Sequence, residues 1–177
     1  YVMSPPLRNK ANQEKLWQGI KNGDIQVVAT DHCPFSYEKE KVPMGKDDFT
    51  KCPNGAPGVE ARMPVLFSEG VMKGRITINK FVEVTSTNPA KICGMYPKKG
   101  SIAVGSDADL VIFDKNKKVT ITKSLFHENV DYTSYEGIEL QGYPIMTIVR
   151  GKVIVKDNEF IGEEGYGQFI KRYKNDD

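Results

Sequence analysis

Hydrophobic positions in the first third of the chain follow two different periods. The stretch 13–22 places its apolar side chains on one helical face, and Gly23 stands where a left-handed residue can end the helix. Residues 25–29 then form a short, nearly continuous apolar run, which is typical of a strand buried on both faces. The pattern therefore predicts a surface helix followed by a buried strand that ends at Asp31.

A strand end is also predicted at the start of the chain, where Tyr1, Val2 and Met3 run directly into Ser4 and two prolines. Prolines cannot donate to a sheet ladder, so they stop the strand just after it begins. Such a strand, with no initiator methionine before it, is an unusual N-terminus. We therefore expect the natural chain to be longer than these 177 residues.

The middle of the chain predicts a long loop and then helices. Residues 35–58 are rich in Pro, Gly, Lys and Asp without periodicity, which indicates a loop of the kind kept for function, such as a lid. Pro64 suits the first turn of a second helix, and Thr77 can cap a third. Pro89 and Gly94 bracket one further short helical piece.

After Pro97 the pattern becomes that of strands separated by Gly and Asp turns. Strand-like segments occur at 102–104, 110–113, 119–121 and 145–155, and the last alternates around Arg150 and Gly151 as a hairpin does. The order of elements predicts an α/β fold, with the closing units of an α/β barrel in residues 1–96 and a small β domain in 97–160. The aromatic and basic tail, 161–177, is expected to contact a neighbouring subunit.

Charge and cysteine content exclude several classes of partner. Lys and Arg number 25 and Asp and Glu 23, so a formal charge of +2 gives no strong field for nucleic acid or an anionic membrane. A small molecule is the better expectation. Three cysteines without a CxxC pair argue against a disulfide framework and favour a reducing cytoplasm. No apolar run approaches the roughly 20 residues that span a bilayer.

Asp31 is the strongest candidate for chemistry, within the sequence TDHCPF. Catalytic groups of parallel barrels project from the C-terminal ends of strands, and the predicted strand ends at this residue. A carboxylate there can bind a divalent cation and exchange a proton with metal-activated water. It can equally cap the following turn through its side chain, and the pattern alone fits both interpretations.

The two histidines of the chain have weaker claims. His32 and Cys33 follow Asp31 on an extended chain and point to other faces, so we expect structural roles for both. His127 lies alone in a polar segment of the β-rich part. With no HxH or HExxH pattern, the chain cannot build a nitrogen-rich binuclear site by itself. The absence of GxSxG argues against a serine triad, and no glycine pattern indicates nucleotide binding.

Ser4 and Asn54 are candidates for substrate binding. Asn54 and Gly55, within CPNGAPGVEAR, favour a tight turn with φ above zero, which would expose backbone amides to a ring imide. Ser4, at the end of the first predicted strand, can offer backbone or hydroxyl groups in the same way. Both residues also fit ordinary turns.

Taken in order, the runs YVMSPPLR, TDHCPF, PNGAPGVEAR and NPAKICGMYPKKGSIAVGSDADLVIFD closely resemble the C-terminal part of the dihydropyrimidinase and D-hydantoinase family of the amidohydrolase superfamily. The resemblance covers essentially the whole chain. It implies the C-terminal portion of a (β/α)₈ TIM barrel followed by part of a β-sandwich domain, in an enzyme with two divalent metal ions, usually zinc.

The resemblance also implies roles for three residues. Asp31 matches the aspartate that binds the more buried metal and moves a proton to the leaving nitrogen. Ser4 and Asn54 match the residues that bind a cyclic imide through main-chain groups. The other family ligands, an HxH pair, a carbamylated lysine and two histidines, have no match here and are expected upstream. The implied reaction is ring opening of 5,6-dihydropyrimidines or hydantoins to N-carbamoyl amino acids.

Several alternatives remain open at this point. Allantoinases and dihydroorotases share a similar strand end, although the PNG loop, VEAR and SPPLR favour the hydantoinase side. Collapsin response mediator proteins keep the fold as non-enzymatic assembly proteins but lack the metal aspartate, so Asp31 argues against that class. We expect the 177-residue chain alone to be inactive and to bind no stoichiometric zinc. Strands taken from a closed barrel expose edges, so we expect the chain alone either to rely on its β-rich half or to bury the exposed surface in an oligomer or partner chain. We also expect a homo-oligomer, dimer or tetramer.

Overall fold

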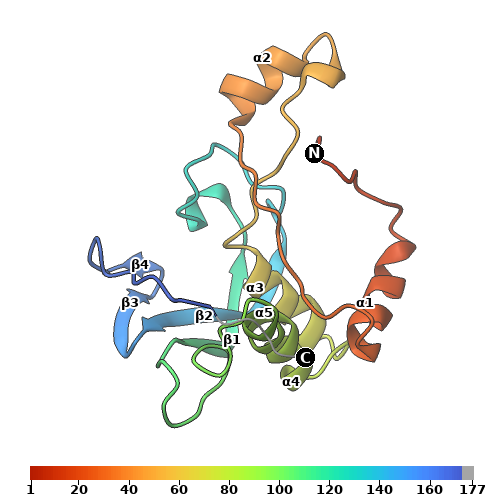
Figure 1. The fold of residues 1–177 in the computed structure, drawn as a ribbon. Helices are drawn as coiled ribbons and strands as arrows, with labels where there is room; N and C mark the ends of the chain where they lie inside the picture. Colours follow the sequence, from red (N-terminus) through yellow and green to blue (C-terminus); the bar gives the residue numbers. More distant parts are fainter. Residues whose placement is uncertain (173–177) are drawn as a thin grey trace.

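The computed structural model describes residues 1–172 as a helical layer beside a four-stranded sheet, with two extended segments that reach away from them (Figure 1). The helical elements are α1 (Asn12–Asn22), η1 (Tyr37–Lys41), α2 (Val42–Gly45), η2 (Phe49–Lys51), α3 (Arg62–Leu66), η3 (Phe67–Met72), α4 (Ile78–Val82), η4 (Glu83–Thr87), α5 (Asn88–Ile92) and η5 (Lys123–Leu125). The strands are β1 (Leu110–Thr120), β2 (Glu139–Val149), β3 (Lys152–Lys156) and β4 (Glu159–Phe160).

Local signals place the helices as the sequence predicts. Gly23 ends α1 at φ 90°, and its N–H donates to the carbonyls of Gly19 and Ile20. Thr77 caps α4 by accepting a hydrogen bond from the Lys80 N–H at 3.1 Å. Pro64 lies in the first turn of α3. The helices predicted at these three places are confirmed.

The sheet is antiparallel throughout, with its strands in the order β1-β2-β3-β4. Two irregularities interrupt the register of β1 against β2, beside Ile112 and beside Asp114. Arg150 and Gly151 join β2 to β3 with φ values of 46° and 81°, both in the left-handed region. This confirms the predicted hairpin, because positive φ at both central residues matches the twist of the flanking strands.

The main core forms where the helices pack on β1 and β2. Phe67 of η3 stacks on Phe113 of β1 with ring centroids 4.7 Å apart, and Phe81 of α4 meets both rings edge-on. Gly142 of β2 makes this approach possible, since a Cβ there would lie 2.4 Å from the Phe67 ring. The buried members of the cluster are Ile20, Leu66, Phe67, Ile76, Phe81 and Val84.

A smaller cluster joins the start of α3 to the far ends of β1 and β2. Its buried members are Ala61, Ile121, Phe126, Leu140 and Tyr143. At the other end of the sheet the tail folds back on the hairpin: Arg150 lies 4.2 Å from the Tyr166 ring centroid, and Phe169 is 94% exposed. The predicted subunit contact of the tail stays a prediction, and its residues 173–177 lie outside the described part.

Three strand predictions are wrong. Residues 1–3 and 25–29 are extended but are assigned to no strand, and 102–104 is an exposed turn in which Val104 is fully accessible. A strand exists only when a neighbour completes its ladder, and within the described residues neither N-terminal segment has one. Residues 24–36 instead run singly past α3 toward α2 (Figure 1).

The loop predicted at 35–58 contains the short helical elements η1, α2 and η2 and projects away from the sheet (Figure 1).

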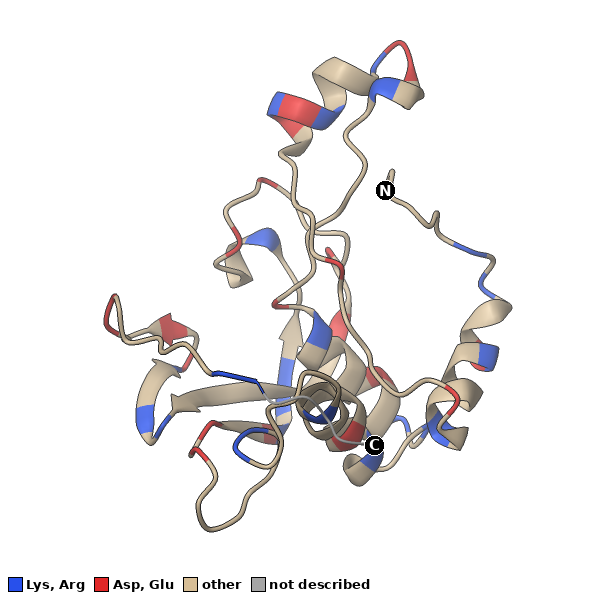
Figure 2. Ribbon diagram, viewed as in Figure 1, with Lys and Arg blue, Asp and Glu red and all other residues tan. Residues whose placement is uncertain are grey.

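The solvent-accessible area of the chain is 11999 Å², well above the roughly 8,600 Å² expected for a compact monomer of this mass. Basic and acidic residues are interspersed along the ribbon (Figure 2). In residues 1–172 no helix is both long and apolar enough to cross a membrane.

Candidate functional site

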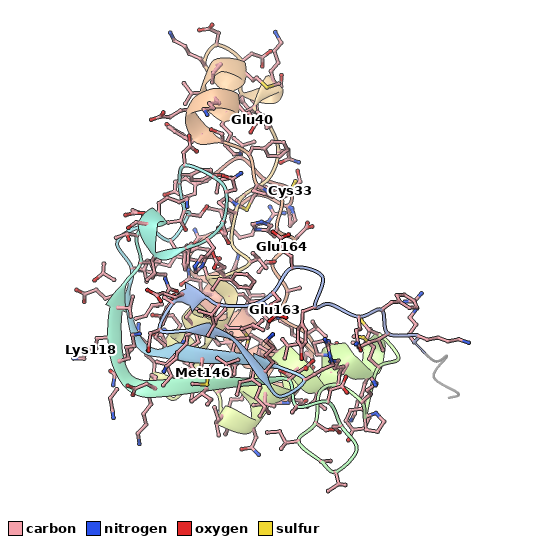
Figure 3. The ribbon with its side chains drawn as sticks, turned by 90° about the vertical axis from the view of Figure 1, so that its left-hand side faces the viewer. Cys33, Glu40, Lys118, Met146, Glu163 and Glu164 are labelled. Carbon is pink, nitrogen blue, oxygen red and sulfur yellow. The ribbon has the colours of Figure 1, made fainter. Side chains whose placement is uncertain are left out.

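Ser4, Asp31 and Asn54 line one cavity of about 510 Å³. They come from three separate segments, the N-terminal arm, the end of the extended stretch 25–31, and the loop before α3. Cys33, Ser134 and Tyr135 also line it. Cys33 lies at the base of the projecting segment that carries Glu40 (Figure 3). The structure therefore brings together the three residues that the sequence singles out.

Asp31 occupies a left-handed backbone conformation, with φ 47°. Few residues other than glycine adopt this region, and aspartate is among those that tolerate it. Residues in such sparsely populated backbone conformations cluster at functional sites. Its side chain is exposed at the cavity, and within the described residues no hydrogen bond or ion pair engages its carboxylate. The turn-capping role is therefore not realised, and the carboxylate is available to a ligand.

His32 turns away from Asp31 and binds the backbone before α3. Its Nδ1 accepts hydrogen bonds from the N–H groups of Gly58, at 3.1 Å, and Val59, at 3.3 Å. A ring nitrogen that accepts carries no proton, so the neutral tautomer with its proton on Nε2 fits this geometry. These two hydrogen bonds hold His32, the residue that follows Asp31, against the backbone before α3.

Glu60 and Glu128 complete this junction by exchanging backbone hydrogen bonds. The Glu60 carboxylate accepts from the N–H groups of His127 and Glu128, and Glu128 Oε1 accepts from the Glu60 N–H at 3.1 Å. His127 Nδ1 lies 2.9 Å from Glu60 Oε1. The second histidine thus belongs to a contact between Glu60, just before α3, and the 127–128 segment, as its weak sequence signal suggests.

Backbone hydrogen bonds bring the three cavity segments together. The Cys33 N–H donates to the Ala56 carbonyl at 3.2 Å, and the Gly55 N–H donates to the Val2 carbonyl at 3.0 Å. Each bond joins two segments that are distant in sequence. The positions of Ser4, Asp31 and Asn54 relative to one another therefore depend on main-chain contacts.

The turn prediction at Asn54 and Gly55 is wrong in its detail. Neither residue has φ above zero. Glycine is needed at position 55 for close approach instead, since a Cβ there would lie 2.5 Å from the Cys33 carbonyl oxygen and 2.9 Å from its sulfur. The NG pair allows two segments to pass in contact, a requirement that local sequence cannot distinguish from a tight turn.

Three residues at or beside the cavity carried no usable sequence signal. Lys41 is only 4% exposed although it lies in a charged stretch, and Ser134 and Tyr135 reach the cavity from the β-rich half. The Ser134 Oγ is buried with no hydrogen-bond partner among the described residues. Burial raises the pKa of the Tyr135 hydroxyl, and the charge of Glu128 adds to this, so the phenol stays protonated at neutral pH.

One acidic side chain at the cavity does not make a metal centre. Among residues 1–172 no group of three His, Cys, Asp or Glu side chains could hold an ion. Asp31 suits one position of such a centre because its carboxylate faces the cavity without another partner. Any further ligands would have to come from outside the described chain.

A larger hollow of about 720 Å³ lies between the α4–α5 helices and β1, and it contains none of the predicted site residues. Most of its lining is apolar, and its charged residues are engaged with one another: Lys99 pairs with Asp107 at 2.9 Å and with Asp109. Size alone does not identify the site here, since chemistry-bearing groups meet in the smaller cavity.

The chain belongs to the amidohydrolase family, whose pattern it matches over residues 4–154. It is 51% identical to the D-hydantoinase of Geobacillus stearothermophilus over 174 residues, which are 98% of this chain and 37% of that protein. The D-hydantoinase structure from Bacillus sp. AR9 superposes with a TM-score of 0.94 at 52% identity, covering 97% of this chain and 38% of that one.

The dihydropyrimidinase structure from Brevibacillus agri NCHU1002 gives a TM-score of 0.94 at 51% identity, covering 97% of this chain and 37% of its own. The resemblance to the hydantoinase and dihydropyrimidinase group is therefore confirmed. The chain spans little more than a third of the length of these relatives.

Proposed function

We propose that the full-length protein containing this chain is a hydantoinase or dihydropyrimidinase-type hydrolase. It opens 5,6-dihydropyrimidines or hydantoins to N-carbamoyl amino acids. The observation that carries this proposal is the single cavity lined by Ser4, Asp31 and Asn54. The close relatives named hydantoinase and dihydropyrimidinase support it.

In the proposed architecture, residues 1–96 are the last strands and helices of a (β/α)₈ barrel and 97–160 are part of a β-sandwich domain. Two features support this division. The extended segments 1–3 and 25–31 lack ladder partners within the described chain, as barrel strands would without their neighbours. The four-stranded antiparallel sheet lies wholly in the second part.

Asp31 is the residue that moves the proton. Hydrolysis adds water across the ring C–N bond, so the water oxygen bonds to the carbonyl carbon and a proton must reach the leaving nitrogen. A carboxylate at the cavity surface can accept a proton from the attacking water and return it to that nitrogen. Two divalent ions, which we propose to be zinc, would polarise the carbonyl and acidify the water when bound, and Asp31 would hold one of them.

Ser4 and Asn54 bind and orient the ring. A cyclic imide alternates N–H donors and carbonyl acceptors, which main-chain groups of two fixed segments can match. The segments around both residues are held by backbone contacts, so these groups are in place before the substrate arrives. Orientation of the scissile amide against Asp31 follows from this arrangement.

The proposed partners are a small cyclic amide and further copies of the same chain, in a cytoplasmic dimer or tetramer. Large accessible area and exposed apolar side chains such as Leu7, Leu16 and Phe169 support burial against other protein. Interspersed charge supports neither nucleic acid nor membrane as a partner (Figure 2).

The direct test compares the full-length protein with the 177-residue chain, each supplied with zinc. We expect the full-length protein to convert hydantoin to N-carbamoylglycine and the short chain to leave it intact, with zinc retained only by the longer protein. Parallel assays with allantoin and dihydroorotate separate the neighbouring activities. Failure of the metal-loaded full-length protein to open any of these rings would refute the proposal.

A further inference from the structure

Lys41, the last residue of η1, is a buried lysine that holds two backbone segments of the cavity. Its Nζ donates to the Val2 carbonyl at 3.1 Å and to the Pro53 carbonyl at 2.8 Å. Within residues 1–172 no carboxylate pairs with it, and the ring centroid of Phe35 lies 6.0 Å away. Burial of an ammonium group is costly unless its hydrogen bonds are made, so these carbonyls are its essential partners.

The two carbonyls lie directly beside the proposed substrate-binding residues. Pro53 immediately precedes Asn54, and Val2 lies two residues before Ser4. The Val2 carbonyl also accepts from the Gly55 N–H at 3.0 Å. Asn54 is thus bracketed, with the carbonyl before it bound to Lys41 and the amide after it bound to Val2.

We propose that Lys41 is a positioning residue that sets the spacing between the Ser4 and Asn54 segments, an inference that rests on the proposed ring-opening function. An ammonium group offers three donors in tetrahedral directions, so one Nζ can bind carbonyls of two separate chains. Hydrogen bonds from a charged donor are the stronger kind, which suits a contact that must not open when substrate binds. Lys41 itself does not line the cavity.

The test uses the full-length, zinc-loaded protein with three substitutions. Lys41→Met removes the donors but keeps the apolar stem, and Lys41→Arg keeps a charged donor. Lys39→Met, an exposed lysine of the same helical turn, is the matched control. The readouts are kcat and KM for hydantoin, bound zinc, and hydrogen exchange of the Gly55 amide.

We expect Lys41→Met to raise KM about tenfold or more with kcat within about threefold, the signature of lost binding that substrate and transition state share. Zinc content should not change, because the residues after Asp31, His32 and Cys33, are held by hydrogen bonds that Lys41 does not make. The Gly55 amide should exchange about tenfold faster, since its acceptor Val2 loses its second hydrogen bond. Lys41→Arg should recover part of both effects, and Lys39→Met should behave as the parent.

An unchanged KM in Lys41→Met, or a loss of zinc and kcat with KM preserved, overturns the proposal. If Lys41→Met does not fold, Lys41→Gln replaces it under the same criteria, and failure of both to fold would make Lys41 a folding residue and not a positioning one. If the parent protein opens no ring, the proposed function has failed. Gly55 exchange then still decides the contact, and equal rates in parent and variant would disprove it.

Discussion

The aromatic core and the cavity are held together by different kinds of contact. Helices and sheet meet through apolar packing around Phe67, Phe81 and Phe113, in which many weak contacts share the stabilisation. The cavity segments meet through a few hydrogen bonds to backbone, made by Lys41, His32 and the Gly55 amide. Substitutions in the first region should change stability, and substitutions in the second should change substrate binding.

The largest stability effect is expected in the core, from Phe67→Ala. Phe67 is 5% exposed and contacts two other rings, so its removal leaves a cavity that should cost about 3–5 kcal/mol of unfolding free energy. Denaturant unfolding of the full-length protein measures this. Phe169→Ala, at a 94% exposed position, should stay within about 0.5 kcal/mol. Equal effects at the two positions would remove the distinction between core and surface.

Gly55→Ala should have a smaller effect on stability and a clear effect on binding. The added methyl would lie 2.5 Å from the Cys33 carbonyl oxygen, so the two segments must separate, at a cost of about 1–3 kcal/mol. We expect a higher KM for hydantoin. Gly167→Ala is the control, because a Cβ there would meet no atom within 4 Å. If Gly167→Ala impairs binding as much as Gly55→Ala, close approach at position 55 is not the cause.

The smallest effect is expected where the projecting segment is tied down by Asp131. Burial raises the pKa of this carboxyl, but hydrogen bonds from the Glu38 and Tyr37 N–H groups and the Ser36 hydroxyl outweigh it and lower the pKa to about 2. Because the folded-state pKa lies below the unfolded-state value of about 3.9, the ionised carboxylate stabilises the fold at pH values above about 3.9. This contribution to stability is lost as the pH falls toward 2.

The protection of the amides of residues 36–41 against hydrogen exchange, measured relative to the intrinsic rate at each pH, should therefore fall between about pH 4 and pH 2 in the parent protein. Asp131→Asn should already show lower protection at neutral pH and little further change over that window. Asp47→Asn, an exposed carboxylate of the same segment, should match the parent. A parent-like pH response in Asp131→Asn would assign the effect to another group.

Sequence predicted the elements whose signals are local. Gly23 ends α1, Thr77 caps the start of α4, and Arg150 and Gly151 form a turn. Each of these features is decided within a few residues. The strands expected at 1–3 and 25–29 failed because a ladder needs a partner that no local pattern supplies. For the same reason, the cavity could be predicted only in part.

Within the site, Ser4, Asp31 and Asn54 could be picked out from strand-end position and resemblance. Lys41 could not, since a lysine in a charged stretch normally indicates a solvated face. Tyr135 and Ser134 join the cavity only through the packing of the 127–138 segment against α3, which no periodicity reveals.

The central claim is that the Asp31 carboxylate acts at this cavity, and Asp31→Asn in the full-length protein tests it most directly. The substitution keeps the size of the side chain and removes its charge and its capacity to take up a proton. We predict a loss of hydantoin ring opening of about 10²–10⁴-fold, together with reduced zinc content and an unchanged unfolding free energy of the metal-free protein. Retention of activity within about tenfold of the parent protein would contradict the account.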